Sequence, residues 1–192
     1  NDTKKKGNLI LHIGTIIEGK INKNDQVKCH INEERRNNCR SYHSATHILH
    51  QALRDELGGH VAQKGSLVSH DKLRFDFSHH LAMSQNEINA VELKINKVIN
   101  KATDVSTKLM SPEDAIKEGA LALFGEKYTD EVRVVSIGEL NNKTYSIELC
   151  GGTHVNNTSE IGKVKLISES SAASGIRRIE ALRGNDLAKY IE

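Results

Sequence analysis

Two pairs of potential metal ligands are each separated by four positions in this sequence. His43 and His47 form the spacing His-x-x-x-His, and Cys150 and His154 form the spacing Cys-x-x-x-His. On a helix, residues four apart lie one turn apart on the same face, about 5–6 Å between Cβ atoms, so two imidazoles there can reach one ion. Imidazole nitrogen and thiolate sulfur together suit zinc. The two pairs therefore predict one zinc ion per chain.

Either spacing by itself is weak evidence. Because the chain has ten His among 192 residues, chance gives about 0.5 His-x-x-x-His pairs and about 0.16 Cys-x-x-x-His pairs. The alternative for His43 and His47 is a pair of surface histidines, and the alternative for Cys150 is an inert buried thiol. His50, one turn beyond His47, is a spare candidate whose alternative is a structural or exposed role. The metal site is therefore a hypothesis that needs support from the surrounding elements.

The element that must position the histidine pair is a helix that begins near Arg40. Apolar residues recur at helical spacing from Ala45 to Leu57, and Gly58-Gly59 supplies the stop. This periodicity places His43 and His47 on the first turns of an amphipathic helix.

The cysteine pair follows a predicted strand at 144–149, in which alternate residues are apolar. Gly151 and Gly152 come directly after Cys150, and two glycines allow a tight backbone turn. Such a turn would bring the Cys150 thiolate and the His154 imidazole onto the same ion.

End signals and periodicity predict the other elements. Ser84 and Glu87 form a capping box that opens a helix, and Ser111-Pro112 opens another. A short helix is expected at 186–191. The predicted strands are 66–69, 73–77, 132–137, 144–149 and 163–168. Because helices and strands mix without a regular βαβ repeat, the expected fold class is α+β.

Residues 1–31 are expected to form a separate small β unit, typical of the end of a β-barrel. Leu9, Leu11 and Ile13 share one parity, and a second short strand is expected at 26–29. The polar segment 32–38 is the expected boundary, with the main domain over 32–192.

The net charge of +2 is too small to mark the chain as a nucleic-acid binder. Any contact with a polyanion must come from local basic clusters, for which a solvated surface is the alternative. These clusters are residues 4–6, 35–36 and 177–178.

Other features concern the compartment. No apolar stretch approaches the roughly 20 residues that span a bilayer, so no membrane partner is expected. The three cysteines are odd in number and irregularly spaced, which favours a reducing cytosol and a cytoplasmic protein. The start, NDTKKKGNLILHIG, has neither an initiator Met nor a signal-peptide pattern, which favours a cut inside a longer protein.

Five stretches, in the same order, resemble the editing domain of alanyl-tRNA synthetases. They are HSATHILHQALRDELGGHVAQKGSLV, KLRFDFSHH, EGALALFGEKYTDEVRVVSIG, SIELCGGTHV and SGIRRIEALRG. The similarity runs through nearly all of residues 9–184. Such a series of long matches is far more specific than a metal spacing.

The resemblance implies an activity and a site. The implied activity is that of an aminoacyl-tRNA deacylase, which hydrolyses tRNA(Ala) mischarged with serine or glycine. Residues 32–192 would be the zinc-dependent editing domain. The implied zinc ligands are His43, His47, Cys150 and His154, and the implied pocket residues are Thr46 and Gln63.

The resemblance also implies what surrounds this domain. Residues 1–31 would belong to a small β-barrel that continues upstream, with the rest of the synthetase as a partner in cis. Because the aminoacylation part is absent, we expect no activation of alanine with ATP. Tyr42 and Ser44 stand where Asn and Thr are expected in the family. Ser44 keeps a hydroxyl, whereas Tyr42 is bulkier than Asn, and its effect on the rim of the pocket is left open.

Roles within the site follow from the chemistry of ester hydrolysis. Zinc would act as Lewis acid, water activator or template, or would organise the pocket if all four ligands bind. The N–H groups of Gly151 and Gly152 are candidate oxyanion donors, with the turn itself as the alternative role. Thr46 is a candidate reader of the serine hydroxyl, or else bonds back to a carbonyl one turn earlier. Arg177 and Arg178 would meet tRNA phosphate or form exposed salt bridges.

Two other functions stay open at this point. A threonyl-tRNA synthetase editing domain shares the paired ligand motifs, although CGGTHV and FGEKY resemble the alanyl type better. A zinc-containing module that binds tRNA without turnover is the non-catalytic alternative.

Overall fold

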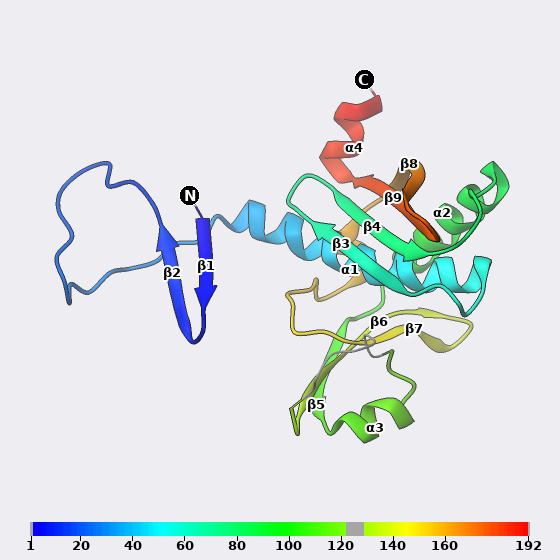
Figure 1. Cartoon of the computed structure of the whole chain (residues 1–192), viewed down its shortest axis with the longest axis horizontal. Coiled ribbons are helices and arrows are strands. Elements are labelled where there is room, and N and C mark those ends of the chain that lie inside the picture. The colour runs from blue at the N-terminus through cyan, green and yellow to red at the C-terminus, as the bar shows by residue number, and fades with distance from the viewer. Residues whose placement is uncertain (1, 122–128, 192) are drawn as a thin grey trace. The chain divides into compact units, whose positions relative to one another are not determined.

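The computed structural model describes residues 2–121 and 129–191 and divides the chain into two compact units, Asn1–Ile31 and Asn32–Glu192 (Figure 1). Helices and strands are mixed along the second unit, which confirms the α+β class. Part of the stretch EGALALFGEKYTDEVRVVSIG, residues 122–128, lies outside the described residues.

The first unit contains one antiparallel hairpin, in which β1 (Asp2–Lys6) pairs with β2 (Leu9–Ile13). The strand expected around Leu9 is thus confirmed, but the strand expected at 26–29 is wrong, since these residues have no regular structure. Val27 is 66 % exposed, and a lone extended segment has neither a ladder partner nor a core to bury it. The β-barrel stays a prediction.

The second unit begins with a long helix, α1 (Glu33–Leu57). The Asn32 side chain accepts the N–H of Arg35 at 2.8 Å and caps the helix, so the predicted start near Arg40 is wrong and residues 33–38 are helical. The first turns are mostly exposed and polar, and therefore lack the apolar stripe that marks the rest. The helix ends at Gly58, whose φ of 111° favours glycine, as predicted.

Helix α1 contacts strands of two antiparallel sheets, β3 and β4 of one and β6 and β7 of the other. Figure 1 shows it running between them. The sheets have the strand orders β3-β4-β9-β8 and β5-β6-β7. Their bounds are β3 (Gln63–Val68), β4 (Leu73–Ser78), β5 (Ser106–Met110), β6 (Val132–Leu140), β7 (Lys143–Leu149), β8 (Val164–Ala173) and β9 (Ile176–Arg183).

The other helices agree with the end signals. The capping box of Ser84 and Glu87 opens α2 (Gln85–Asn100), and Ser111 caps α3 (Pro112–Lys117). The remaining helices are the short 3₁₀ helix η1 (Thr158–Ile161) and α4 (Gly184–Ile191). No described helix is long and apolar enough to cross a membrane.

The larger of two hydrophobic clusters holds α1 and α2 against the sheets. Burying each large apolar side chain contributes roughly 1.5–3 kcal/mol, so this core fixes α1 firmly. Its fully buried members include Tyr42, Ile48, Leu49, Leu53, Phe75, Phe77, Val91, Ile95, Val98, Ile137 and Ile179.

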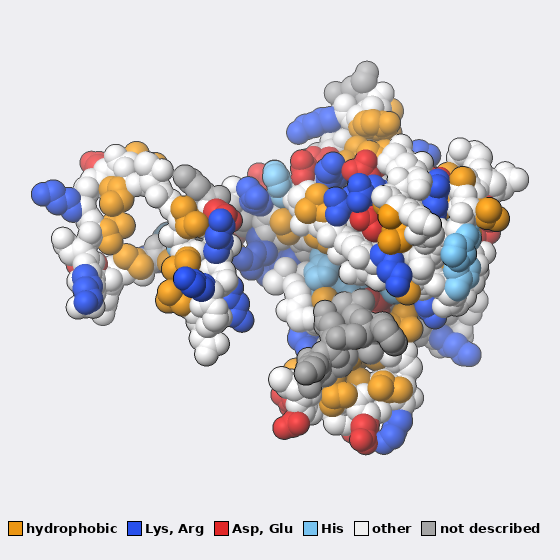
Figure 2. Space-filling model, in the orientation of Figure 1, with side chains coloured by type: hydrophobic (Ala, Val, Ile, Leu, Met, Phe, Trp, Pro, Cys, Tyr) orange, Lys and Arg blue, Asp and Glu red, His pale blue; other side chains and the backbone are white. Residues whose placement is uncertain are grey.

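Strand β9 was not predicted, because charged residues interrupt its pattern. Arg178 forms a bidentate pair with Asp76 of β4, at 2.7 and 2.8 Å. Arg177 forms another with Glu169 of β8, at 2.5 and 2.7 Å. Figure 2 shows Lys and Arg interleaved with Asp and Glu over this part of the molecule. Cross-strand ion pairs thus replace the apolar alternation that normally identifies a strand.

Candidate metal centre

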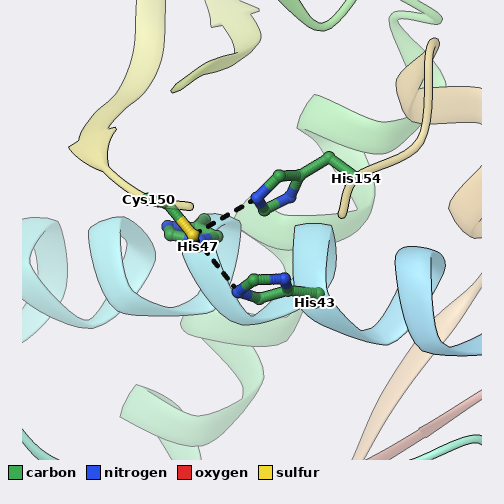
Figure 3. Close-up of side chains that lie close together, drawn as sticks. All are labelled: His43, His47, Cys150 and His154. Carbon is green, nitrogen blue, oxygen red and sulfur yellow. Dashed lines mark hydrogen bonds between the residues drawn. The ribbon is translucent and has the colours of Figure 1, made fainter. Parts of the chain in front are cut away.

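The four predicted ligands lie together where α1 passes the end of β7. Figure 3 shows His43 and His47 on the helix, facing Cys150 and His154 of the loop after β7. One ligand atom from each lies within 4.8 Å of the others, and this is the one such group among the described residues. The geometry therefore offers a single centre for a metal ion.

The distances between donor atoms match a tetrahedral zinc site. Cys150 Sγ lies 3.5 Å from His43 Nε2 and 3.4 Å from His154 Nε2. Tetrahedral zinc with Zn–S of about 2.3 Å and Zn–N of about 2.0–2.1 Å separates sulfur and nitrogen ligands by about 3.5 Å. The sulfur and these two nitrogens are therefore spaced as three ligands of one zinc ion would be, and His47 completes the set within 4.8 Å.

Hydrogen bonds to Nδ1 orient the rings of His43 and His47, the two histidines on the helix. His47 Nδ1 lies 2.8 Å from the Glu148 carboxylate, and His43 Nδ1 lies 3.2 Å from the carbonyl oxygen of Thr153. Such partners fix the tautomer in which Nε2 faces the metal. His47 Nε2 is buried without a hydrogen-bond partner among the described residues, as expected for a nitrogen that holds an ion.

Ser44 orients the third histidine. Its hydroxyl oxygen lies 3.1 Å from His154 Nδ1 and accepts the N–H of Val155 at 3.2 Å. Ser44 is fully buried. The hydroxyl expected at this position thus supports the ligand set and fixes the loop against α1.

The turn between Cys150 and His154 requires glycine at one position. A Cβ at Gly152 would collide with the His43 ring, whereas a Cβ at Gly151 would meet open space. The Gly152 N–H donates to Cys150 Sγ at 3.4 Å, and Arg133 holds the turn through the carbonyl oxygens of Cys150 and Gly152. Since the Gly152 N–H is directed at the sulfur, the oxyanion role of these glycines stays a prediction.

The protonation states favour metal binding. Burial raises the pKa of the Cys150 thiol, but the three surrounding histidines outweigh it and bring the pKa down to about 3. Burial lowers the pKa of His47, but Cys150 and Glu148 outweigh it and raise the pKa to about 10. At neutral pH the centre therefore holds a thiolate ligand, and a proton on His47 that a metal ion would displace.

A small cavity of about 120 Å³ adjoins the ligands. It holds several waters or a small substrate group, since one water needs only about 10–15 Å³ in this measure. Its lining includes the predicted Thr46 and Gln63 and also the spare candidate His50; the full set is His43, Thr46, His47, His50, Gln63, Ser66, Glu148, Leu149 and Cys150.

Sequence reasoning missed Glu148 and Ser66 in this lining. Ser66 lies within a predicted strand, and its hydroxyl is 3.4 Å from the Gln63 amide nitrogen. Glu148 alternates with the apolar residues of β7, and in such a pattern the polar side of a strand normally faces solvent. No signal in the sequence marks that side as buried.

Tyr42, whose effect on the pocket rim was left open, is not among the residues that line the cavity. Its side chain is fully buried, and its hydroxyl lies 2.9 Å from the carbonyl oxygen of Asp71 and 3.0 Å from the Asp186 carboxylate. It also accepts the N–H of Arg183. The Tyr42 side chain is part of the core and not of the cavity lining, and through Asp186 it ties α1 to α4.

The two arginines predicted to meet tRNA are not part of this centre. Arg177 and Arg178 lie on β9 in the bidentate pairs described above, with side chains 14 % and 36 % exposed. The salt-bridge role left open for them is therefore present in the structure.

Comparison with known proteins shows the class of protein to which this chain is similar. Residues 132–180, which span β6, β7 and the Cys150 loop, match the family model described as the threonyl and alanyl tRNA synthetase second additional domain. Alanine–tRNA ligases of Chelativorans sp., Parvibaculum lavamentivorans and Paramagnetospirillum magneticum are 51 %, 53 % and 54 % identical over 100 %, 99 % and 95 % of this chain. The chain thus belongs to the alanyl-tRNA synthetase family. It spans only 22 %, 22 % and 20 % of the length of these relatives.

Substitution of the two glycines tests the geometry of the centre. We expect Gly152→Ala to weaken zinc binding by about 10–100-fold, as other changes that misplace a ligand do, because the new methyl displaces His43. Gly151→Ala is the matched control and should bind zinc as the unchanged chain does. Competition with a chromophoric chelator measures both affinities, and equal affinities for the two variants would contradict this geometry.

Zinc binding should also release a proton. At pH 7 we expect release of about one proton, from His47, since its pKa lies near 10 without metal. Apparent affinity should fall about tenfold per pH unit of acidification while His47 holds this proton. Calorimetric titrations in two buffers of different ionisation enthalpy measure the release. A buffer-independent binding enthalpy at pH 7 would show that His47 is already neutral.

Proposed function

We propose that this chain is an editing deacylase, which hydrolyses the ester bond of tRNA(Ala) that carries serine or glycine. The observation that carries the proposal is a His₃Cys centre beside a small cavity lined by hydroxyl and amide groups. Membership of the alanyl-tRNA synthetase family supports tRNA(Ala) as partner, with the rest of the synthetase in cis. Cytoplasmic localisation is proposed on the same ground.

The proposed resident metal is one zinc ion per chain. Bound there, zinc supplies a Lewis acid or a fixed organising charge beside the ester. Since all four donor atoms lie within 4.8 Å of one another, all four can hold one ion together. A water position on the ion would require one ligand to leave.

The cavity favours a small aminoacyl group. Its volume of about 120 Å³ leaves little room for large side chains, so glycine and serine fit by size. Size alone does not separate these from alanine. Selection of serine over alanine therefore needs a polar contact to the serine hydroxyl, which alanine cannot make. Glycine has no hydroxyl, so its release does not depend on this contact.

Thr46 offers that contact. Its hydroxyl donates to the carbonyl oxygen of Tyr42 at 2.8 Å, which is the back-bonding role expected of a Thr within a helix. The lone pairs on Oγ1 remain available, because a hydroxyl has one donor and two acceptor sites. A serine substrate can donate to Oγ1, whereas alanine leaves it unpaired. Gln63 is the proposed second polar contact, to water or substrate.

Arg177 and Arg178 are proposed contacts to tRNA phosphate. Each ion pair uses Nε and one terminal nitrogen, and a guanidinium has five N–H donors. The remaining donors can bind a phosphate without breaking the pairs. Arg178 is the more exposed and therefore the better placed of the two.

The deciding experiment compares substrates. We expect the zinc-loaded chain to release serine and glycine from tRNA(Ala) much faster than alanine, with Cys150→Ala losing both zinc and turnover. Faster release from seryl-tRNA(Thr) than from seryl-tRNA(Ala) would identify a threonyl-type editing domain. Binding of zinc and tRNA without any release would identify a non-catalytic module.

Substitution of Thr46 tests the specificity. We expect Thr46→Val to narrow the ratio of seryl to alanyl deacylation by at least about tenfold, because the acceptor for the serine hydroxyl is lost. Zinc content should not change. Thr46→Ser keeps the hydroxyl and should retain the ratio. An unchanged ratio in Thr46→Val would assign discrimination to another residue, with Gln63 the next to test.

A further inference from the structure

A buried carboxylate joins the metal centre to a second histidine. Glu148 accepts hydrogen bonds from Nδ1 of His47 at 2.8 Å and from Nδ1 of His50 at 2.9 Å. The three residues are 5–7 % exposed. The Ser146 hydroxyl adds a third donor at 3.4 Å. Both carboxylate oxygens are thus used within the protein.

The two histidines differ in the surroundings of Nε2, the ring nitrogen that does not bind Glu148. His47 Nε2 belongs to the ligand cluster. His50 does not, yet its ring lines the cavity, and its Nε2 is buried with no hydrogen-bond partner among the described residues. A buried polar atom without a partner costs stability, which favours a role in binding or catalysis.

Glu148 determines which His50 tautomer is present. An ionised carboxylate only accepts hydrogen bonds, so Nδ1 of His50 carries the proton. Nε2 of the neutral ring then carries the lone pair. A carboxylate that holds an imidazole in this way is the arrangement that prepares histidine to take a proton.

Other groups of the cavity are poorly suited to that task. The hydroxyls of Thr46 and Ser66 and the amide of Gln63 are weak bases near neutral pH. The ligand nitrogens and the thiolate are engaged when a metal is held. Among the described residues of the lining, His50 Nε2 is the basic atom left free.

We propose that His50 is the general base of the editing reaction, with Glu148 as its positioning residue; this rests on the deacylase function proposed above. As the water oxygen bonds to the ester carbonyl carbon, one water O–H bond breaks and its proton passes to His50 Nε2. When the C–O bond to the ribose breaks, His50 returns that proton to the departing oxygen. The products are the free amino acid and tRNA with a free terminal hydroxyl.

The test uses two variants of His50, each with an amide group near a different ring nitrogen. His50→Asn places an amide nitrogen near the position of Nδ1 and keeps a donor for Glu148, whereas His50→Gln places an amide group near Nε2 that cannot take a proton. We expect both to bind zinc and to lose about 10²–10⁴-fold in the single-turnover rate on seryl-tRNA(Ala), the usual contribution of a general base. His80→Asn, an exposed histidine outside the cavity, is the control and should retain the rate.

A second nucleophile separates proton transfer from structural damage. Hydroxylamine attacks esters without a base, so enzyme-dependent formation of serine hydroxamate, above the protein-free rate, should fall far less in the variants than hydrolysis does. In the unchanged chain, hydrolysis should be slower in D₂O than in H₂O, and hydroxamate formation should not. These last measurements need no variant, and the absence of an isotope effect on hydrolysis overturns the proposal even if both substitutions prevent folding.

The outcomes separate this inference from the function on which it rests. If the unchanged chain does not hydrolyse seryl-tRNA(Ala), the deacylase proposal fails. If it does, but His50→Asn and His50→Gln retain the rate, His50 is a structural residue. Equal losses in hydrolysis and hydroxamate formation, or no solvent isotope effect, would likewise overturn the role of a base.

Discussion

The Glu148 carboxylate is the interaction on which the arrangement of the site depends. An isolated buried charge costs several kcal/mol, and here two imidazole N–H groups and the Ser146 hydroxyl offset that cost. Burial raises the pKa of Glu148, but the hydrogen bonds from His47 and His50 outweigh it and bring the pKa down to about 2. The carboxylate therefore stays ionised. Because one carboxylate accepts from both His47 and His50, it directs one ring to the ligand cluster and keeps the other in the tautomer with a free Nε2.

Helix α1 holds these rings in place because one of its sides lines the cavity while the others pack in the core. Residues 43, 46, 47 and 50 recur at helical spacing and line the cavity, whereas Tyr42, Ile48, Leu49 and Leu53 are fully buried in the core. A site on an element fixed by packing is positioned more precisely than one on a free loop. The other two ligands do come from a loop, but Arg133 and Ser44 bind it on both sides.

The local parts of this arrangement were predictable and the long-range parts were not. The ligand pairs, the capping box at Ser84 and the turn at Gly152 depend on residues a few positions apart. The burial of Glu148 depends on α1 lying against β7, which the alternation of residues along the strand does not reveal. The place of Tyr42 in the core also depends on long-range contacts, since its hydroxyl binds partners 29 and 144 positions away. Spacing could show which residues share a face, but only the fold shows what that face meets.

Charge balance then connects the metal to the fold. The centre places two anions, the Cys150 thiolate and the Glu148 carboxylate, on either side of His47, in surroundings that exclude most water. Without metal, the proton on His47 compensates only one of them. With a divalent cation held by these ligands, both anions would be compensated and His47 would be neutral, so that no buried charge would remain unbalanced. His47 and His50 share one carboxylate, but only His47 belongs to the ligand cluster, and this difference is the reason for proposing metal binding by His47 and proton transfer by His50.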